Sequence, residues 1–236
     1  MATFVLIHGA GDTGWYWHLT EAELHARGHQ TIAPDLPCDN NTASLDDYAA
    51  TVAGAADAAD ATDAAAGRQD LVIVGQSYGA FTATLAASQL EGARLLVLLA
   101  GMIPVHGESP GQWWTSTGYR QAVEEQARLD GGKTGNDDPL IQYYNGVPRA
   151  LAEEALRRGG RGESSVVWDM PWPLDAWPDV PTKVILCKED RFFPAAFMRR
   201  VAHERLGTVP DQVPGCHCVA LSHPRELSDL LASYPD

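Results

Sequence analysis

The chain has 236 residues, of which 45% are hydrophobic, and carries a formal net charge of −14 at pH 7. This length and composition predict one α/β domain with an insertion and a sizeable core, and they exclude a disordered chain. Because phosphate binding requires a basic surface, the negative charge argues against a nucleic-acid partner.

The chain begins MATFVLIHGAG, in which residues 3–8 predict a first strand and residues 8–11 a glycine-rich turn. This start lacks basic residues and its apolar run is only one strand long, so we expect no signal peptide. No segment is apolar over the length that a bilayer requires. We therefore expect a cytoplasmic location and no membrane partner.

Helices and strands alternate in the next part of the chain. Residues 19–27 predict a helix and residues 31–34 a short strand. Ser44 has the features of an N-cap, with acidic residues in the first turn of an alanine-rich helix that is predicted to reach about Ala66. Such alternation predicts a mostly parallel sheet with right-handed crossovers.

Residues 71–90, LVIVGQSYGAFTATLAASQL, contain the main chemical motif. The apolar, β-branched run at 71–75 predicts a strand buried on both faces, and the residues after Gly79 predict a helix. Between them, Ser77 lies in the pattern G-x-S-x-G, which in a strand–turn–helix context indicates a nucleophile elbow. The alternative is a small residue that merely fits a tight turn.

Residues 95–100 predict another strand, after which the regular alternation stops until about Asp179. We expect an α/β core from residues 1–101 and 179–236, with residues 102–178 as a helical cap over the carboxyl end of the sheet. Residues 148–158 predict a helix within this cap, with Pro148 at its start.

Aromatic residues are concentrated in the insertion, where most are expected to fill the cap's own core. Some are expected to line a substrate pocket. The pocket candidates are Gly9, Trp113, Trp114, Tyr143 and Trp168. The same aromatic content is compatible with a homodimer.

A serine hydroxyl needs a general base, which is usually a histidine oriented by a carboxylate. His217 lies in the loop VPGCHCVALSHPREL after the last predicted strand. His223 precedes Pro224, which is typical of the first position of a helix, so His223 is expected to start that helix instead. The pattern therefore favours His217 as the base.

The strand predicted at 183–187 runs directly into KEDRFFP. A carboxylate just beyond the carboxyl end of a parallel strand shares the edge of the sheet with Ser77. Asp190 is the predicted acid, with Glu189 as the alternative. Asp190 has a purely structural alternative role as the cap of a helix near Pro194.

An oxyanion hole requires two backbone N–H groups aimed at the developing negative charge. One is expected from Tyr78, directly after the nucleophile, and the other from Ala10 in the glycine-rich turn. The run Cys216-His217-Cys218 lacks the C-x-x-C spacing of zinc sites, so we expect no metal and no cofactor.

These motifs together resemble the α/β-hydrolase superfamily, and within it the small branch of plant methylesterases, hydroxynitrile lyases and bacterial esterases. The resemblance covers nearly the whole chain and is strongest at FVLIHGAG, VGQSYGA, KEDRFFP and HCVALSHPREL, and weak through the insertion. It implies an α/β-hydrolase fold with six strands flanked by helices. It also implies the nucleophile Ser77, the acid Asp190, the base His217 and the oxyanion donors Ala10 and Tyr78.

At two places the sequence differs from related enzymes in a way that argues against their reactions. Hydroxynitrile lyases of this branch have threonine and lysine at the positions of Gly9 and Cys218, so cyanohydrin cleavage is not expected. Ser77 also differs from the elbow aspartate of haloalkane dehalogenases. The expected function is hydrolysis of a small to medium, largely apolar or aromatic carboxylic ester through an acyl-enzyme. The alternatives are a thioesterase or lactonase with the same triad, a small-molecule receptor without turnover, and cofactor-free perhydrolysis.

Overall fold

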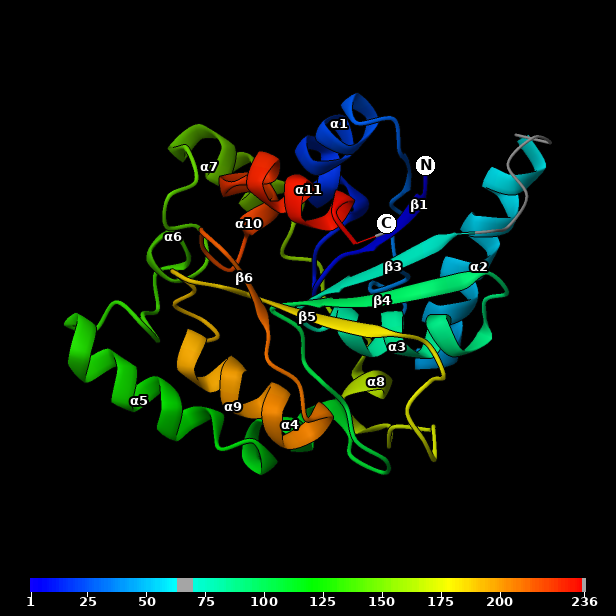
Figure 1. Ribbon diagram of the computed structural model, residues 1–236. Coiled ribbons are helices and arrows are strands. Elements are labelled where there is room, and N and C mark those ends of the chain that lie inside the picture. Colours follow the sequence, from blue (N-terminus) through cyan, green and yellow to red (C-terminus); the bar gives the residue numbers. More distant parts are fainter. Residues whose placement is uncertain (63–69, 235–236) are drawn as a thin grey trace.

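The computed structural model describes residues 1–62 and 70–234, in which six parallel strands form one sheet (Figure 1). The strands are β1 (Thr3–Ile7), β2 (Gln30–Ile32), β3 (Leu71–Gln76), β4 (Ala93–Leu99), β5 (Thr182–Cys187) and β6 (Asp211–Val213). They lie in the order β2-β1-β3-β4-β5-β6, and each pairs in parallel with its neighbours. The predicted α/β fold with a six-stranded sheet is confirmed.

The interior strands are buried because their sequences are almost wholly apolar. Every residue of β3 and the last five of β4 are buried, as expected for strands that helices cover on both faces. The edge strand β6 has the sequence DQV, which contains no apolar run. For this reason the residue pattern alone does not identify β6, although the family resemblance implies a sixth strand.

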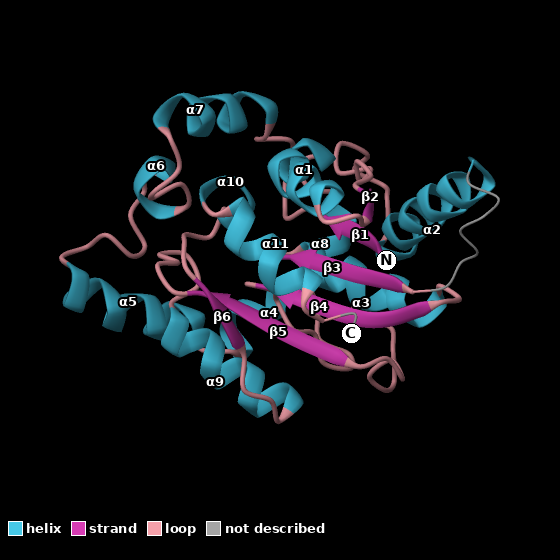
Figure 2. Ribbon diagram, turned by 45° about the horizontal axis from the view of Figure 1, so that its top comes forward, coloured by secondary structure: helices cyan, strands magenta, loops and turns pink. Residues whose placement is uncertain are grey.

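Helices cover both faces of the sheet, as Figures 1 and 2 show. On one face, α1 (His18–Ala26) packs against α11 (Pro224–Ala232). On the other, α2 (Leu45–Thr62) packs against α3 (Gly79–Gln89), and α9 (Ala195–Leu206) lies beside β5. A short 3₁₀ helix, η1 (Gly14–Trp17), precedes α1, and α10 (Val219–Ser222) precedes α11.

The start of α2 confirms the predicted N-cap. The Ser44 hydroxyl accepts a hydrogen bond from the Asp47 backbone N–H at 3.2 Å, and the Asp47 carboxylate accepts one from the Ser44 N–H at 2.8 Å. This reciprocal pair satisfies two donors at the helix start. The predicted end of this helix near Ala66 lies outside the described residues. No helix of the described chain is both long and apolar enough to cross a bilayer.

The segment between β4 and β5 contributes five further helices, which occupy two places around the core. The helices are α4 (Pro110–Ser116), α5 (Tyr119–Asp130), α6 (Pro139–Gln142), α7 (Arg149–Arg158) and α8 (Ser165–Asp169). Pro139 of α6 and Leu156 of α7 line a cavity with Ser77, so these helices cover the carboxyl ends of the strands. In contrast, α8 packs beside α3, where the Trp168 ring lies 4.9 Å from that of Tyr78.

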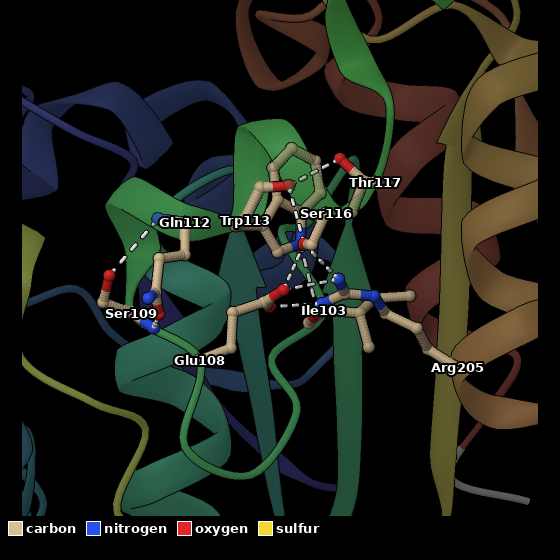
Figure 3. Close-up of polar contacts among 8 residues, drawn as sticks. All are labelled: Ile103, Glu108, Ser109, Gln112, Trp113, Ser116, Thr117 and Arg205. Carbon is tan, nitrogen blue, oxygen red and sulfur yellow. Dashed lines mark hydrogen bonds and ion pairs between the residues drawn. The ribbon is translucent and has the colours of Figure 1, made fainter.

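A buried ion pair joins this segment to α9 (Figure 3). The Arg205 guanidinium donates to both carboxylate oxygens of Glu108, at 2.6 and 2.8 Å. Both side chains are largely buried, and the indole N–H of Trp113 donates to the carbonyl of Ile103 at 3.1 Å beside them. Bidentate geometry fixes the relative position of the two segments, because both N–H donors must align at once.

Candidate active site

Ser77 lies at the sharp turn from β3 to α3, and the turn depends on two glycines. A Cβ atom on Gly79 would lie 2.3 Å from the carbonyl oxygen of His8, and one on Gly75 would lie 2.5 Å from the Cβ of Ala83. Both distances are impossible for real side chains, so only glycine allows α3 to approach β1 and β3 this closely. Ser77 itself has φ +54°, a left-handed conformation that is rare for serine and costs energy.

The backbone of Ser77 is fixed on two sides. Its N–H donates to the carbonyl of Leu99 at 3.1 Å, and its own carbonyl accepts from the N–H of Met102 at 3.0 Å. Within the described chain, the hydrogen bonds of Ser77 all involve its backbone. Its hydroxyl therefore stays available to a ligand in the cavity that Ser77 lines.

Asp190 and His217 form a buried pair beside this cavity. The Nδ1–H of His217 donates to Oδ2 of Asp190 at 2.8 Å, and the two side chains are 6% and 1% exposed. Oδ1 of Asp190 accepts from the backbone N–H groups of Phe192 and Phe193, each at 2.8 Å. The carboxylate is thus held rigidly. Because Nδ1 carries the proton, Nε2 of His217 keeps a free lone pair, as a general base requires.

The two alternatives, Glu189 and His223, both support the loop that carries His217. The carboxylate of Glu189 accepts a hydrogen bond from the backbone N–H of Gly215. Gly215 has φ +112°, and a Cβ there would lie 2.6 Å from Nδ1 of His223. His223 itself forms the N-cap position of α11, as expected from the proline that follows it.

The glycine-rich turn after β1 brings Ala10 to the cavity beside Ser77. Among the described residues, the backbone N–H groups of Ala10 and Tyr78 have no protein acceptor. Two residues of the insertion hold this turn in place. The backbone N–H of Gly11 donates to the carboxylate of Glu163 at 2.7 Å, and the carbonyl of Gly11 accepts from the N–H of Arg161 at 3.1 Å. Two unsatisfied donors on a fixed turn can stabilise a negatively charged oxygen.

His8 braces the same turn as a neutral imidazole. Its Nε2 accepts from the backbone N–H of Leu36 at 3.0 Å, which requires Nδ1 to carry the proton and donate to the carbonyl of Gly9 at 2.8 Å. Burial lowers the pKa of His8 to about 4, because a charged ring would lose its hydration. This histidine is therefore structural, as its position at the end of the first strand suggests.

The cavity has a volume of about 260 Å³. Its lining consists of Gly9, Ala10, Asp12, Tyr16, Gln76, Ser77, Pro139, Tyr143, Tyr144, Leu156, Phe192, His217 and Cys218. Of the predicted pocket residues, the structure brings Gly9 and Tyr143 to this cavity and places three tryptophans elsewhere. Trp113 is fully buried against Phe197, Trp114 packs on Tyr119, and Trp168 packs on Tyr78.

Several lining residues are absent from the sequence predictions. Tyr144 directly follows the predicted Tyr143, and Phe192 lies two residues after the predicted Asp190, so their positions in the chain could have indicated them. Asp12 and Tyr16 follow the oxyanion turn, and no motif marks them. Burial raises the pKa of Asp12 to about 6. Over the described residues, no group of three or more potential metal-ligating side chains occurs.

Comparison with known proteins agrees with this geometry. The alpha/beta hydrolase family matches residues 4–230 of the chain. Norfluorocurarine synthase 2 from Strychnos sp is 32% identical over 247 residues, which cover 97% of this chain and 93% of that protein. Esterase PIR7B from Oryza sativa subsp. japonica is 26% identical over 256 residues, with 97% and 93% covered. The crystal structure of polyneuridine aldehyde esterase has a TM-score of 0.74 at 19% identity, over 100% of both chains. The chain is therefore an α/β-fold hydrolase that belongs to the alpha/beta hydrolase family, as its motifs predict.

Proposed function

We propose that the protein hydrolyses a carboxylic ester through an acyl-enzyme on Ser77. The proposal rests on one observation: Ser77 and His217 line the same cavity, and the carboxylate of Asp190 orients the ring of His217. A serine at an elbow becomes nucleophilic when an oriented imidazole can remove its proton.

The reaction has two halves. The Ser77 oxygen attacks the ester carbonyl carbon while Nε2 of His217 takes the hydroxyl proton, and the N–H groups of Ala10 and Tyr78 stabilise the oxyanion. His217 then gives the proton to the departing alcohol, which leaves an acyl-serine. Water attacks this acyl group with His217 again as base, and release of the acid restores Ser77.

The cavity favours a small to medium ester. Its volume of about 260 Å³ lies just below the usual range of ligand pockets, about 300–1,000 Å³. The rings of Tyr143 and Phe192 stand 4.8 Å apart and offer an apolar surface next to His217. The full-length similarity to a rice esterase supports an ester as the substrate class.

A thioesterase or lactonase would use the same residues, but a coenzyme A thioester should require basic groups near the pocket. No lysine or arginine is among the residues that line the cavity. Most of the insertion's arginines are paired with neighbouring carboxylates: Arg120 with Glu124, Arg149 with Glu153, and Arg157 and Arg158 with Glu154. These observations favour an oxygen ester.

Intact-protein mass spectrometry after treatment with a fluorophosphonate tests the nucleophile. We expect one adduct on the wild type and none on Ser77→Ala or His217→Ala, with matching loss of nitrophenyl-ester turnover. His203→Ala is the matched control, because this histidine is exposed on α9. A folded wild-type protein with neither adduct nor turnover would disprove the hydrolase proposal and favour a receptor that binds a small molecule.

A further inference from the structure

Asp12 places an unpaired carboxylate in the lining of the cavity that contains Ser77. One of its oxygens accepts from the backbone N–H of Thr13 at 2.9 Å. The nearby guanidinium of Arg161 pairs with Asp39 at 2.8 Å and donates to the backbone carbonyl of Asp12 at 3.3 Å. Among the described residues, Asp12 therefore has no ion-pair partner, although most of its surface is buried.

The part of the cavity next to Asp12 is aromatic, and no lysine or arginine is among the residues that line the cavity. Tyr16, Tyr143, Tyr144 and Phe192 all line the same cavity. The hydroxyl of Tyr16 is buried and has no hydrogen-bond partner among the described residues, which is unusual for a tyrosine that lines a cavity. A carboxylate among aromatic rings is the combination by which proteins bind ammonium cations, through charge attraction and cation–π contact.

We propose that Asp12 and the tyrosine rings beside it form a subsite for an ammonium group, so that the preferred substrates are esters that carry such a cation. The inference rests on the proposed ester hydrolysis, to which it adds a substrate class. Net charge agrees with it, because a chain with a charge of −14 attracts cationic substrates and repels anionic ones.

The charge of the subsite depends on pH in a defined way. Burial raises the pKa of Asp12 to about 6, the Arg161 charge lowers it, and the Asp35 charge raises it. Burial also raises the pKa values of the Tyr16 hydroxyl and the Cys218 thiol, so both stay neutral in this range. Any pH dependence of the catalytic step itself cancels when two esters are compared on the same enzyme.

The test compares butanoylcholine with its uncharged isostere, 3,3-dimethylbutyl butanoate. We expect the wild type to prefer the choline ester by roughly tenfold or more in kcat/KM at pH 8, the size expected for a partly solvated charge pair. The preference should shrink at pH 5, where Asp12 is mostly protonated, and Asp12→Asn should lose it at both pH values. Asp175→Asn is the matched control, because its side chain is 97% exposed, and it should keep the preference.

A binding measurement separates this inference from the proposed reaction. In Ser77→Ala, which cannot form the acyl-enzyme, calorimetry should show tighter binding of the choline ester than of its isostere. The additional change Asp12→Asn should remove the difference. If wild type shows no Ser77-dependent turnover, the hydrolase proposal fails and the binding experiment alone decides the subsite. Equal binding or hydrolysis of the two esters, or a preference that survives Asp12→Asn, would overturn the inference.

Discussion

The carboxylate of Glu163 accepts a hydrogen bond from the backbone N–H of Gly11 at 2.7 Å, although the two residues are 152 positions apart. Its second oxygen accepts from the hydroxyl of Tyr48 at 2.9 Å. Gly11 directly follows Ala10, the proposed oxyanion donor. A residue of the insertion thus holds the turn on which the proposed catalysis depends, and this contact couples insertion and core.

Replacing Glu163 with alanine should lower kcat by about tenfold with a smaller change in KM, because a misplaced donor weakens transition-state binding more than substrate binding. Steady-state kinetics with a nitrophenyl ester measure both parameters, and Glu163→Gln, which keeps one acceptor for Gly11, should recover part of kcat. Glu153→Ala on the exposed face of α7 is the control. An unchanged kcat in a folded Glu163→Ala protein would assign Glu163 a structural role only.

Replacing Asp190 with asparagine should lower kcat by roughly 10³- to 10⁴-fold, because the amide no longer holds His217 with its proton on Nδ1. The comparison variant is Glu189→Gln, whose side chain can still accept from the N–H of Gly215. It should keep most of the turnover. If Glu189→Gln were the more damaging change in esterase assays, Glu189 would be the acid and Asp190 would be a structural residue.

His8 and Asp12 should have opposite effects on acid stability. The folded pKa of His8, about 4, lies below its usual 6.5. Between these two pH values the unfolded chain binds more protons than the folded one, so stability falls as the pH drops from 6.5 to 4. The folded pKa of Asp12, about 6, lies above its usual 3.8, so stability falls as the pH rises from 3.8 to 6. In the wild type these two effects partly cancel.

Asp12→Asn removes the opposing effect of Asp12, so the loss of stability at acid pH that His8 causes should become larger. Between pH 6.5 and 4, its free energy of unfolding should fall more steeply than that of the wild type, by on the order of 2 kcal/mol. Urea unfolding at several pH values measures this difference, because all other titrating groups are shared. A difference between the two proteins that does not change with pH would show that Asp12 titrates normally in the fold.

Replacing Arg205 with methionine should destabilise the protein by about 3 kcal/mol, because it leaves the buried carboxylate of Glu108 without a counter-charge. Adding Glu108→Gln should restore part of the loss, since the uncompensated charge is then gone. Thermal and urea unfolding of both variants measure the effect. Equal stability of the single variant and the wild type would show that water can replace Arg205 at this ion pair.

Local patterns were sufficient to predict the elements that place Ser77 and Asp190, whereas His217 was found from its place in a loop late in the chain. Ser77 has a five-residue motif between an apolar strand and a helix. Asp190 and His217 come near the ends of later elements, and in a parallel sheet such positions meet at one edge. For these three residues, chain order and strand direction alone predict proximity, and the structure brings all three to one region.

The tertiary structure decided which side chains line the cavity. The aromatic content of the insertion is visible in the sequence, but the Trp113 ring packs on Phe197 of α9 and the Trp168 ring on Tyr78 at the start of α3, so neither lines the cavity. Asp12 has no motif, and its burial depends on distant residues 159–163 that cross the turn. The sequence by itself determined that the sheet is mostly parallel and which chemistry to propose, because both follow from local pattern and from the alternation of strands and helices. Pocket shape and charge depend on contacts between residues far apart in the chain, so only the folded structure decided them.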